Sequence, residues 1–271
     1  MGGVDPLFAI YRSRADRLVA ELWAVHLGAG AILGVIVAVL SPLDWWSMPL
    51  ALALAGAVAL WGHRAGEKRL ATALCPEGST MLGSAGAPRL ANIVDGLCLL
   101  VGVEAPSLVV SESPAANIAA VGRRSDQSTL VVTRGLLDSL NLIELEAAVA
   151  RVLTQIRDGR TAYMTTAVTT VGLPALWSVG LRGIVRSRLE REASTGSDFD
   201  ADAEAVRLTR YPPGLANALE SMSGVGVGVD APAVTWPLWL ADPRAATSAA
   251  PDALPDYRAD LETRVAVLRE F

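Results

Sequence analysis

Residues 132–160 read VTRGLLDSLNLIELEAAVARVLTQIRDGR, and the spacing of their apolar side chains predicts a helix over residues 142–158. Asn141 precedes this helix and Glu144 follows three residues later, as in a capping box, while Gly159 provides a stop. The expected core stripe comprises Leu142, Leu145, Val149, Leu153 and Ile156. A second face carries Glu144, Ala148, Arg151 and Gln155. The helix is therefore predicted to pack by its apolar stripe, with Arg151 and Gln155 together on another face.

Short apolar runs before this helix predict a small sheet. Residues 107–111 (SLVVS) and 128–133 (STLVVT) are typical of strands, and residues 89–103 have helical spacing that ends at Gly102. Strands beside helices indicate an α+β domain that is mainly helical.

Two uncharged runs nearer the N-terminus, residues 24–40 and 46–62, come close to the roughly 20 residues that a membrane-spanning helix needs. Residues 41–44 (SPLD) form the turn between them. The flanks are basic, with Arg12, Arg14 and Arg17 before the first run and Arg64, Lys68 and Arg69 after the second. The positive-inside rule then places both ends in the cytoplasm. We expect a transmembrane hairpin over residues 1–70 and a cytoplasmic domain over residues 71–271, held in the inner (plasma) membrane.

A third uncharged run, residues 161–181, has arginines at both ends. A single crossing would carry one set of arginines outside, which the positive-inside rule disfavours. We expect this segment to dip into the membrane or lie against it.

The amino-acid composition excludes some classes of function. The chain is 52% hydrophobic and 19% charged, with a net charge of −5 and a mean hydropathy of +0.38. This balance suits a membrane anchor joined to a folded domain and offers no basic field for nucleic acid. Cys75 and Cys98 lack metal-site spacing, and the only histidines are His26 and His63, so the last two hundred residues contain none.

Residues 132–160 resemble the HtpX family of membrane zinc metallopeptidases, in which the same framework carries the zinc helix. That helix reads H-E-x-x-H in the family, because two histidines one turn apart grip zinc while the glutamate polarises the attacking water. Here Arg151, Val152 and Gln155 stand at those three positions. Arginine cannot give up its proton to bind a cation, valine has no proton-accepting group, and glutamine is at most a weak oxygen ligand. The resemblance therefore implies the fold of a metallopeptidase without its catalytic residues.

Three later stretches extend the resemblance over roughly residues 89–271. Residues 198–202 (DFDAD) resemble the family's E-x-x-A-D motif, which puts Asp198 at a zinc-ligand position and Asp202 at the position that supports the ligands. Residues 236–243 (WPLWLADP) resemble an HLWFANP-like segment. Residues 261–268 (LETRVAVL) resemble the family's C-terminal helix, with Arg264 at its arginine.

Two interpretations of these positions remain open. Arg151 and Gln155 are a solvated helix face in the first, and residues 198–202 are an acidic helix start stabilised by the helix dipole. In the second, Arg151 pairs with Asp198 or Asp202, so that a guanidinium replaces zinc.

The favoured function is a non-catalytic, membrane-anchored pseudopeptidase that acts as a binding, scaffold or regulatory subunit. Substrates of the family lie along an edge strand, and we expect Leu130, Val131, Val132 and Thr133 to offer such an edge to a peptide or another membrane protein. Membrane lipid is the other expected partner, with no metal and no cofactor.

The alternative is an active metal-dependent endopeptidase in which Asp198 and Asp202, with Glu144 or Glu146, hold a metal other than zinc. Arg151 on the same helix face would repel such a cation. A transporter is poorly supported, because two or three short spans give no translocation path.

Overall fold

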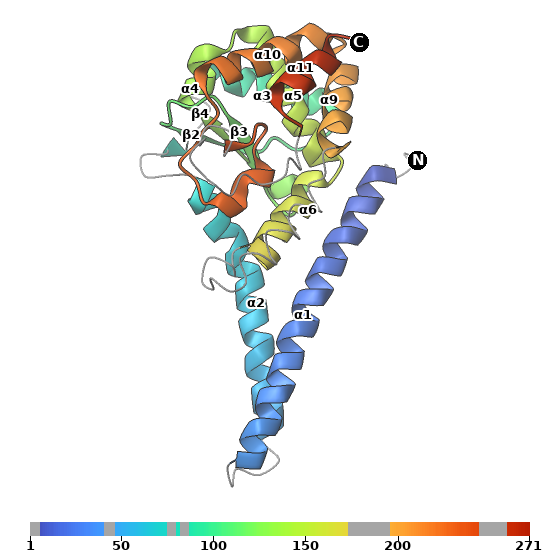
Figure 1. Ribbon diagram of the computed structural model, residues 1–271, viewed down its shortest axis with the longest axis vertical. Coiled ribbons are helices and arrows are strands. Elements are labelled where there is room, and N and C mark those ends of the chain that lie inside the picture. The colour runs from blue at the N-terminus through green and yellow to red at the C-terminus, as the bar shows by residue number, and fades with distance from the viewer. Residues whose placement is uncertain (1–5, 41–46, 75–79, 82–86, 173–195, 244–258) are drawn as a thin grey trace.

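The computed structural model describes residues 6–40, 47–74, 80–81, 87–172, 196–243 and 259–271. Two long helices, α1 (Pro6–Leu40) and α2 (Ser47–Leu74), converge away from a compact α+β domain, so that the molecule is elongated (Figure 1). This arrangement confirms the predicted fold class, a mainly helical α+β domain preceded by long apolar helices.

Small residues bring α1 and α2 close together. A Cβ atom added to Gly30 would lie 2.6 Å from Cβ of Ala55, and one added to Gly34 would lie 3.3 Å from Cβ of Ala51. Spacing of four residues between small side chains on both helices is the usual means of close packing within a membrane. Large apolar side chains cover the outside of the pair and are exposed: Val25, Leu27, Ile32, Leu33, Val35, Ile36, Val39, Met48, Leu50, Leu54, Val58 and Trp61.

One helix among the described residues is long and apolar enough to cross a membrane. It covers Pro6–Val39, its most apolar window has a mean hydropathy of 2.2, and 11% of that window is buried. The described part of α2 does not meet the same measure, and the predicted turn over residues 41–44 lies outside the described residues. Membrane association is thus supported by α1 together with the exposed apolar surface of the pair.

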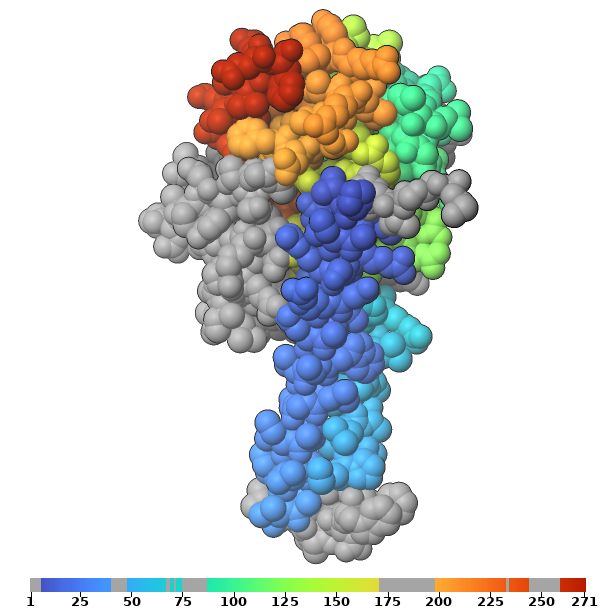
Figure 2. Space-filling model, turned by 90° about the vertical axis from the view of Figure 1, so that its right-hand side faces the viewer, coloured from blue at the N-terminus to red at the C-terminus, as the bar shows by residue number. Residues whose placement is uncertain are grey.

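The N-terminal part of α1 packs on the domain rather than extending freely (Figure 2). The rings of Tyr11 and Tyr163 have centroids 5.8 Å apart, and the guanidinium of Arg160 lies 5.2 Å from the Tyr11 ring centroid. Leu18 is buried in the same apolar cluster as Tyr163. Gly159 adopts φ 79° beside this contact, where an added Cβ would lie 3.1 Å from the Phe8 ring, so glycine suits both the backbone and the space.

The sheet has four strands in the order β1-β2-β4-β3. Their bounds are β1 Thr80–Met81, β2 Ser107–Ser111, β3 Ile118–Val121 and β4 Thr129–Thr133. β4 pairs in parallel with β2 and antiparallel with β3, so that Val131 lies opposite both Val109 and Ala119.

Both faces of the sheet are buried, which explains why its strands read as continuous apolar runs. Leu130 and Val132 enter one core cluster, formed largely with α3 (Pro88–Val101) and α5 (Leu142–Arg157). Val131 enters the other cluster, with Tyr163 and Trp239. The prediction that Leu130, Val131, Val132 and Thr133 form a free edge is wrong, because β2 and β3 occupy both sides of β4.

The remaining helices cover the sheet and the polar face of α5. They are α4 (Arg134–Ser139), α6 (Arg160–Ala167), the π-helix η2 (Val168–Gly172), α9 (Gly196–Thr209), α10 (Pro212–Val225) and α11 (Leu261–Leu268). Two 3-10 turns, η1 (Ser125–Gln127) and η4 (Ala233–Leu238), complete the described elements. Residues 161–172 of the predicted membrane-associated segment 161–181 lie in α6 and η2, where residues 161–170 are buried except for the half-buried Ala162, and residues 173–181 lie outside the described residues.

The capping residues and the apolar stripe predicted for α5 are both seen in the structure. The Asn141 side chain accepts hydrogen bonds from the amides of Ile143 and Glu144, and the Glu144 carboxylate accepts one from the Asn141 amide. The predicted core stripe is buried except for Leu142, which is 57% exposed. Leu142 begins the helix, and its neighbour Ile143 is also exposed, because this first turn extends past the elements that cover the rest of α5.

Candidate functional site

Arg151 and Gln155, one turn apart on α5, face the first turns of α9. The Arg151 side chain is only 1% exposed, although arginine is among the residues least often buried without a partner. Its Nη1 donates to Oε1 of Gln155 at 2.8 Å, so the two side chains are hydrogen-bonded to each other across one turn of α5. The interpretation of this face as solvated is wrong.

Two aspartates on α9 also accept hydrogen bonds from Arg151. Arg151 Nη2 donates to Oδ1 of Asp198 at 2.8 Å, and Nε donates to Oδ1 of Asp202 at 3.1 Å. Both carboxylates are almost completely buried. The four-residue spacing places them on one face of α9, opposite the matching face of α5. The predicted ion pair between Arg151 and the aspartates is therefore confirmed, and it involves both of them.

Arg264 of α11 brings a second guanidinium that sequence reasoning did not place in the site. Its Nε donates to Oδ2 of Asp202 at 2.7 Å, and its Nη2 donates to Oδ1 of Asp202 at 2.8 Å. Burial opposes its charge, but Asp202 and then Asp198 outweigh burial, and the pKa of Arg264 is raised. The sequence signal that could have drawn attention to Arg264 is its place in residues 261–268, which resemble the family's C-terminal helix.

Arg151, Asp198, Asp202 and Arg264, which we call the ion cluster, join three helices. α5, α9 and α11 gather at the end of the domain farthest from the tip of the helical pair (Figure 1). Two positive and two negative groups leave no formal net charge, and each carboxylate accepts a charge-assisted hydrogen bond. The cluster thus links the three helices through buried, charge-assisted hydrogen bonds.

The chemistry available here differs from that of a zinc site. Val152, at the position of the family's glutamate, is buried and has no group to activate water. Within the described parts of the chain, no three histidine, cysteine, aspartate or glutamate side chains come together as a metal site would require. Asp200, between the two buried aspartates, is exposed.

The glutamates of the alternative hypothesis lie elsewhere. Glu144 is bonded to the N-cap of α5, two turns from Arg151. Glu146 lines a separate cavity of about 190 Å³ with Ile143 and Tyr211. The structure does not bring either one to Asp198 and Asp202.

Residues of the third family-like stretch cover the outer edge of β3. Ala119 forms an antiparallel bridge with Trp239, and the Leu240 amide donates to the Ile118 carbonyl at 2.7 Å. The Leu240 carbonyl in turn accepts a hydrogen bond of 3.0 Å from Nη1 of Arg264. The backbone of one residue, Leu240, therefore links the sheet edge to the ion cluster.

Asn117 fixes the same segment just before β3. Its Nδ2 donates to the carbonyls of Val227 and Ala241, and its Oδ1 accepts from the amides of Ile118 and Ala241. Since the Asn117 side chain is fully buried, these bonds are shielded from water. The chain's own residues thus occupy the β3 edge of the sheet.

An apolar anchor, an α+β domain and a pair of facing helices with metal-site spacing define a metallopeptidase-like membrane protein. Comparison with known proteins identifies relatives of this chain. The chain is 32% identical over 185 residues to "Protease HtpX homolog" of Dictyoglomus turgidum, covering 58% of this chain and 61% of that protein. It is 27% identical over 178 residues to "Protease HtpX homolog" of Listeria monocytogenes, covering 51% of this chain and 59% of that protein.

An archaeal relative gives a similar match. "Protease HtpX homolog 2" of Methanosarcina mazei is 28% identical over 174 residues, covering 55% of this chain and 59% of that protein. By sequence, this chain is HtpX-like, and it spans about three fifths of the length of the curated relatives it matches. No family model matches the chain, and no solved structure matches it significantly.

Proposed function

We propose that this chain is a membrane-anchored pseudopeptidase, an HtpX-like domain that serves as a non-catalytic binding, scaffold or regulatory subunit. The observation that carries the proposal is the guanidinium of Arg151, which lies within hydrogen-bonding distance of Gln155, Asp198 and Asp202. A cation at the same place would be repelled by this fixed positive charge. The expected partner is another membrane protein or a peptide segment.

The covered edge of β3 supports the same proposal. Substrate addition to a sheet requires free backbone groups along an edge strand. Here the Ile118 carbonyl is already bonded to Leu240, and Asn117 holds the adjoining backbone. A partner is therefore expected to use another surface of the domain or of the helical pair.

The alternative, an active endopeptidase with carboxylate ligands, has less support. Asp198 and Asp202 already accept hydrogen bonds from arginines, and a divalent cation would have to displace at least one guanidinium. Loss of such a buried partner is costly.

Metal analysis tests the two functions against each other. We expect full-length protein, purified in detergent and given zinc, to retain far less than one equivalent after desalting and to cleave no peptide substrate. The Asp198→Asn variant is the control, because a metal held by these carboxylates would be lost with it. Near-stoichiometric metal in the natural chain that falls in Asp198→Asn would overturn the proposal, as would chelator-sensitive peptide cleavage.

We propose that the helical pair lies in the inner (plasma) membrane with the domain in the cytoplasm, as the basic flanks indicate. A cysteine introduced at the exposed residue Ser223 is expected to escape a membrane-impermeant thiol reagent in intact cells and to react after permeabilisation. Ser41→Cys, in the predicted turn, should react in intact cells and is the matched control. Labelling of Ser223→Cys without permeabilisation would contradict this topology.

A further inference from the structure

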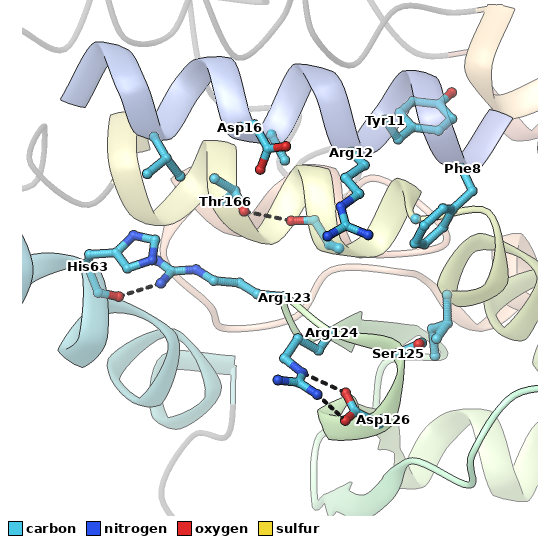
Figure 3. A pocket seen from close by; sticks show the side chains of 15 residues that line it. Phe8, Tyr11, Arg12, Asp16, His63, Arg123, Arg124, Ser125, Asp126 and Thr166 are labelled. Carbon is cyan, nitrogen blue, oxygen red and sulfur yellow. Dashed lines mark hydrogen bonds and ion pairs between the residues drawn. The ribbon is translucent and has the colours of Figure 1, made fainter. Parts of the chain in front are cut away.

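A cavity of about 670 Å³ lies between the N-terminal part of α1 and the domain (Figure 3). Its lining comes from α1, α6, the turn between β3 and β4, His63 within α2 and Ile156 of α5. The charged or titratable side chains among the lining residues are Tyr11, Arg12, Asp16, His63, Arg123, Arg124 and Asp126. This cavity is separate from the ion cluster, and neither Arg151 nor Arg264 contributes to its lining.

The cavity opens where the apolar part of the helical pair ends. Val19 lines it on α1, only five residues before the uncharged run of residues 24–40 begins. Five residues of helix span about 7.5 Å. His63 lines the cavity on α2, directly after the run of residues 46–62 ends. If the apolar surface lies in hydrocarbon, these residues lie at the depth of the lipid headgroups.

The three arginines of the cavity come from two parts of the chain, Arg12 from α1 and the other two from the turn between β3 and β4. Arg123 donates to the backbone carbonyl of His63 and to Thr169 Oγ1, the latter at 2.7 Å, which fixes its position. Arg124 pairs with Asp126 through bonds of 2.9 and 2.5 Å. Arg12 projects from α1 toward these two residues (Figure 3). Within the described parts of the chain, Arg12 forms no ion pair, so its charge is available to a ligand.

Charge and shape together favour an anion. Three arginines and two aspartates leave the lining with a net charge of +1, with histidine counted as neutral. Guanidinium groups match the oxygens of a phosphate with paired hydrogen bonds. Exposed apolar side chains such as Val25 and Trp61 continue from the cavity along the helical pair, where acyl chains can pack.

We propose that this cavity binds a phosphate group, and that its source is the headgroup of an anionic membrane phospholipid. Arg12 and Arg124 contact the phosphate, while Arg123 is a positioning residue that ties the β3–β4 turn to α2 and η2. The lipid thereby bridges α1 to the domain at the membrane surface. This inference does not depend on whether the domain is catalytic.

Binding is measured with full-length protein in an uncharged detergent, using short-chain phosphatidylglycerol, short-chain phosphatidylcholine and inorganic phosphate as probes. We expect saturable binding of phosphatidylglycerol and weaker binding of the other two. Arg12→Gln and Arg124→Gln should each weaken phosphatidylglycerol binding about fivefold, the change expected for about 1 kcal/mol per arginine. Arg17→Gln, which alters an exposed arginine of α1 outside the cavity, should leave the affinity unchanged.

A variant that is expected to strengthen binding shows that weaker binding in the arginine variants does not come from misfolding. Asp126→Asn removes the carboxylate that pairs with Arg124, so it should tighten phosphatidylglycerol binding severalfold. Arg12→Lys keeps the charge and should retain most of the affinity. The proposal is overturned if Arg12→Gln and Arg124→Gln bind like the natural chain, or if phosphatidylcholine binds as tightly. Equal affinity for inorganic phosphate and for phosphatidylglycerol would reject the membrane as the source.

Discussion

Replacement of Arg151 by alanine is expected to lower the free energy of unfolding by about 3–5 kcal/mol, because it leaves buried carboxylates without their partner. Asp198 loses the hydrogen bond that the structure shows from Arg151, whereas Asp202 keeps Arg264. Denaturant or thermal unfolding of the detergent-solubilised protein measures the loss. Arg134→Ala is the matched control: its pair with Glu112 lies at the surface, where water screens the two charges, and should contribute little to stability.

The pattern among variants distinguishes the ion cluster from simple loss of packing. Asp202→Ala is expected to cost at least as much as Arg151→Ala, since Asp202 accepts from two guanidinium groups. In a double-mutant cycle, Arg151→Ala and Asp198→Ala should show coupling well above the roughly 0.5 kcal/mol found for independent sites. Additive effects, or an Arg151→Ala cost no larger than that of Arg134→Ala, would show that the guanidinium does not hold α5 to α9.

Restoring the family's residues is expected to restore zinc binding. The variant combines Arg151→His, Val152→Glu, Gln155→His and Asp198→Glu, which places two histidines one turn apart on α5 opposite a glutamate on α9. Three such side chains and a water satisfy the tetrahedral preference of zinc. Arg264 remains paired with Asp202 and keeps α9 against α11. We expect elemental analysis to find about one equivalent of zinc and chelation to lower the unfolding temperature.

The matched control is the same variant with Gln155 unchanged, which lacks one ligand and should bind zinc far more weakly. Metal content is the primary measurement because Leu240 still covers the β3 edge, and metal binding alone does not open that edge to a peptide. A folded quadruple variant that takes up no more zinc than its control would show that α5 and α9 do not preserve a metal-site geometry.

Much of the local structure of this protein could be predicted from the sequence alone, because it depends on residues that are close together in the chain. The capping box of α5 depends on Asn141 and Glu144, three positions apart, and the buried strands follow from short apolar runs. The resemblance to the HtpX family likewise predicted a lost zinc site from the residue types at Arg151, Val152 and Gln155. The pairing of Arg151 with the aspartates also followed from the resemblance, since that gave the positions which face each other.

The strand order, the role of Arg264 and the cavity depend on contacts between segments far apart in the chain, so only the tertiary structure revealed them. β4 lies inside the sheet because β3 pairs on its second side, and no local pattern in residues 129–133 specifies that strand order. Arg264 reaches Asp202 across 62 positions of sequence, so its role follows from how α11 packs. The cavity beside the N-terminal part of α1 is formed by α1, α2, α5, α6 and the β3–β4 turn together, and their separate sequences do not encode a shared opening. Sequence periodicity specifies which face of an element is buried, whereas the partner of that face depends on the packing of the whole chain.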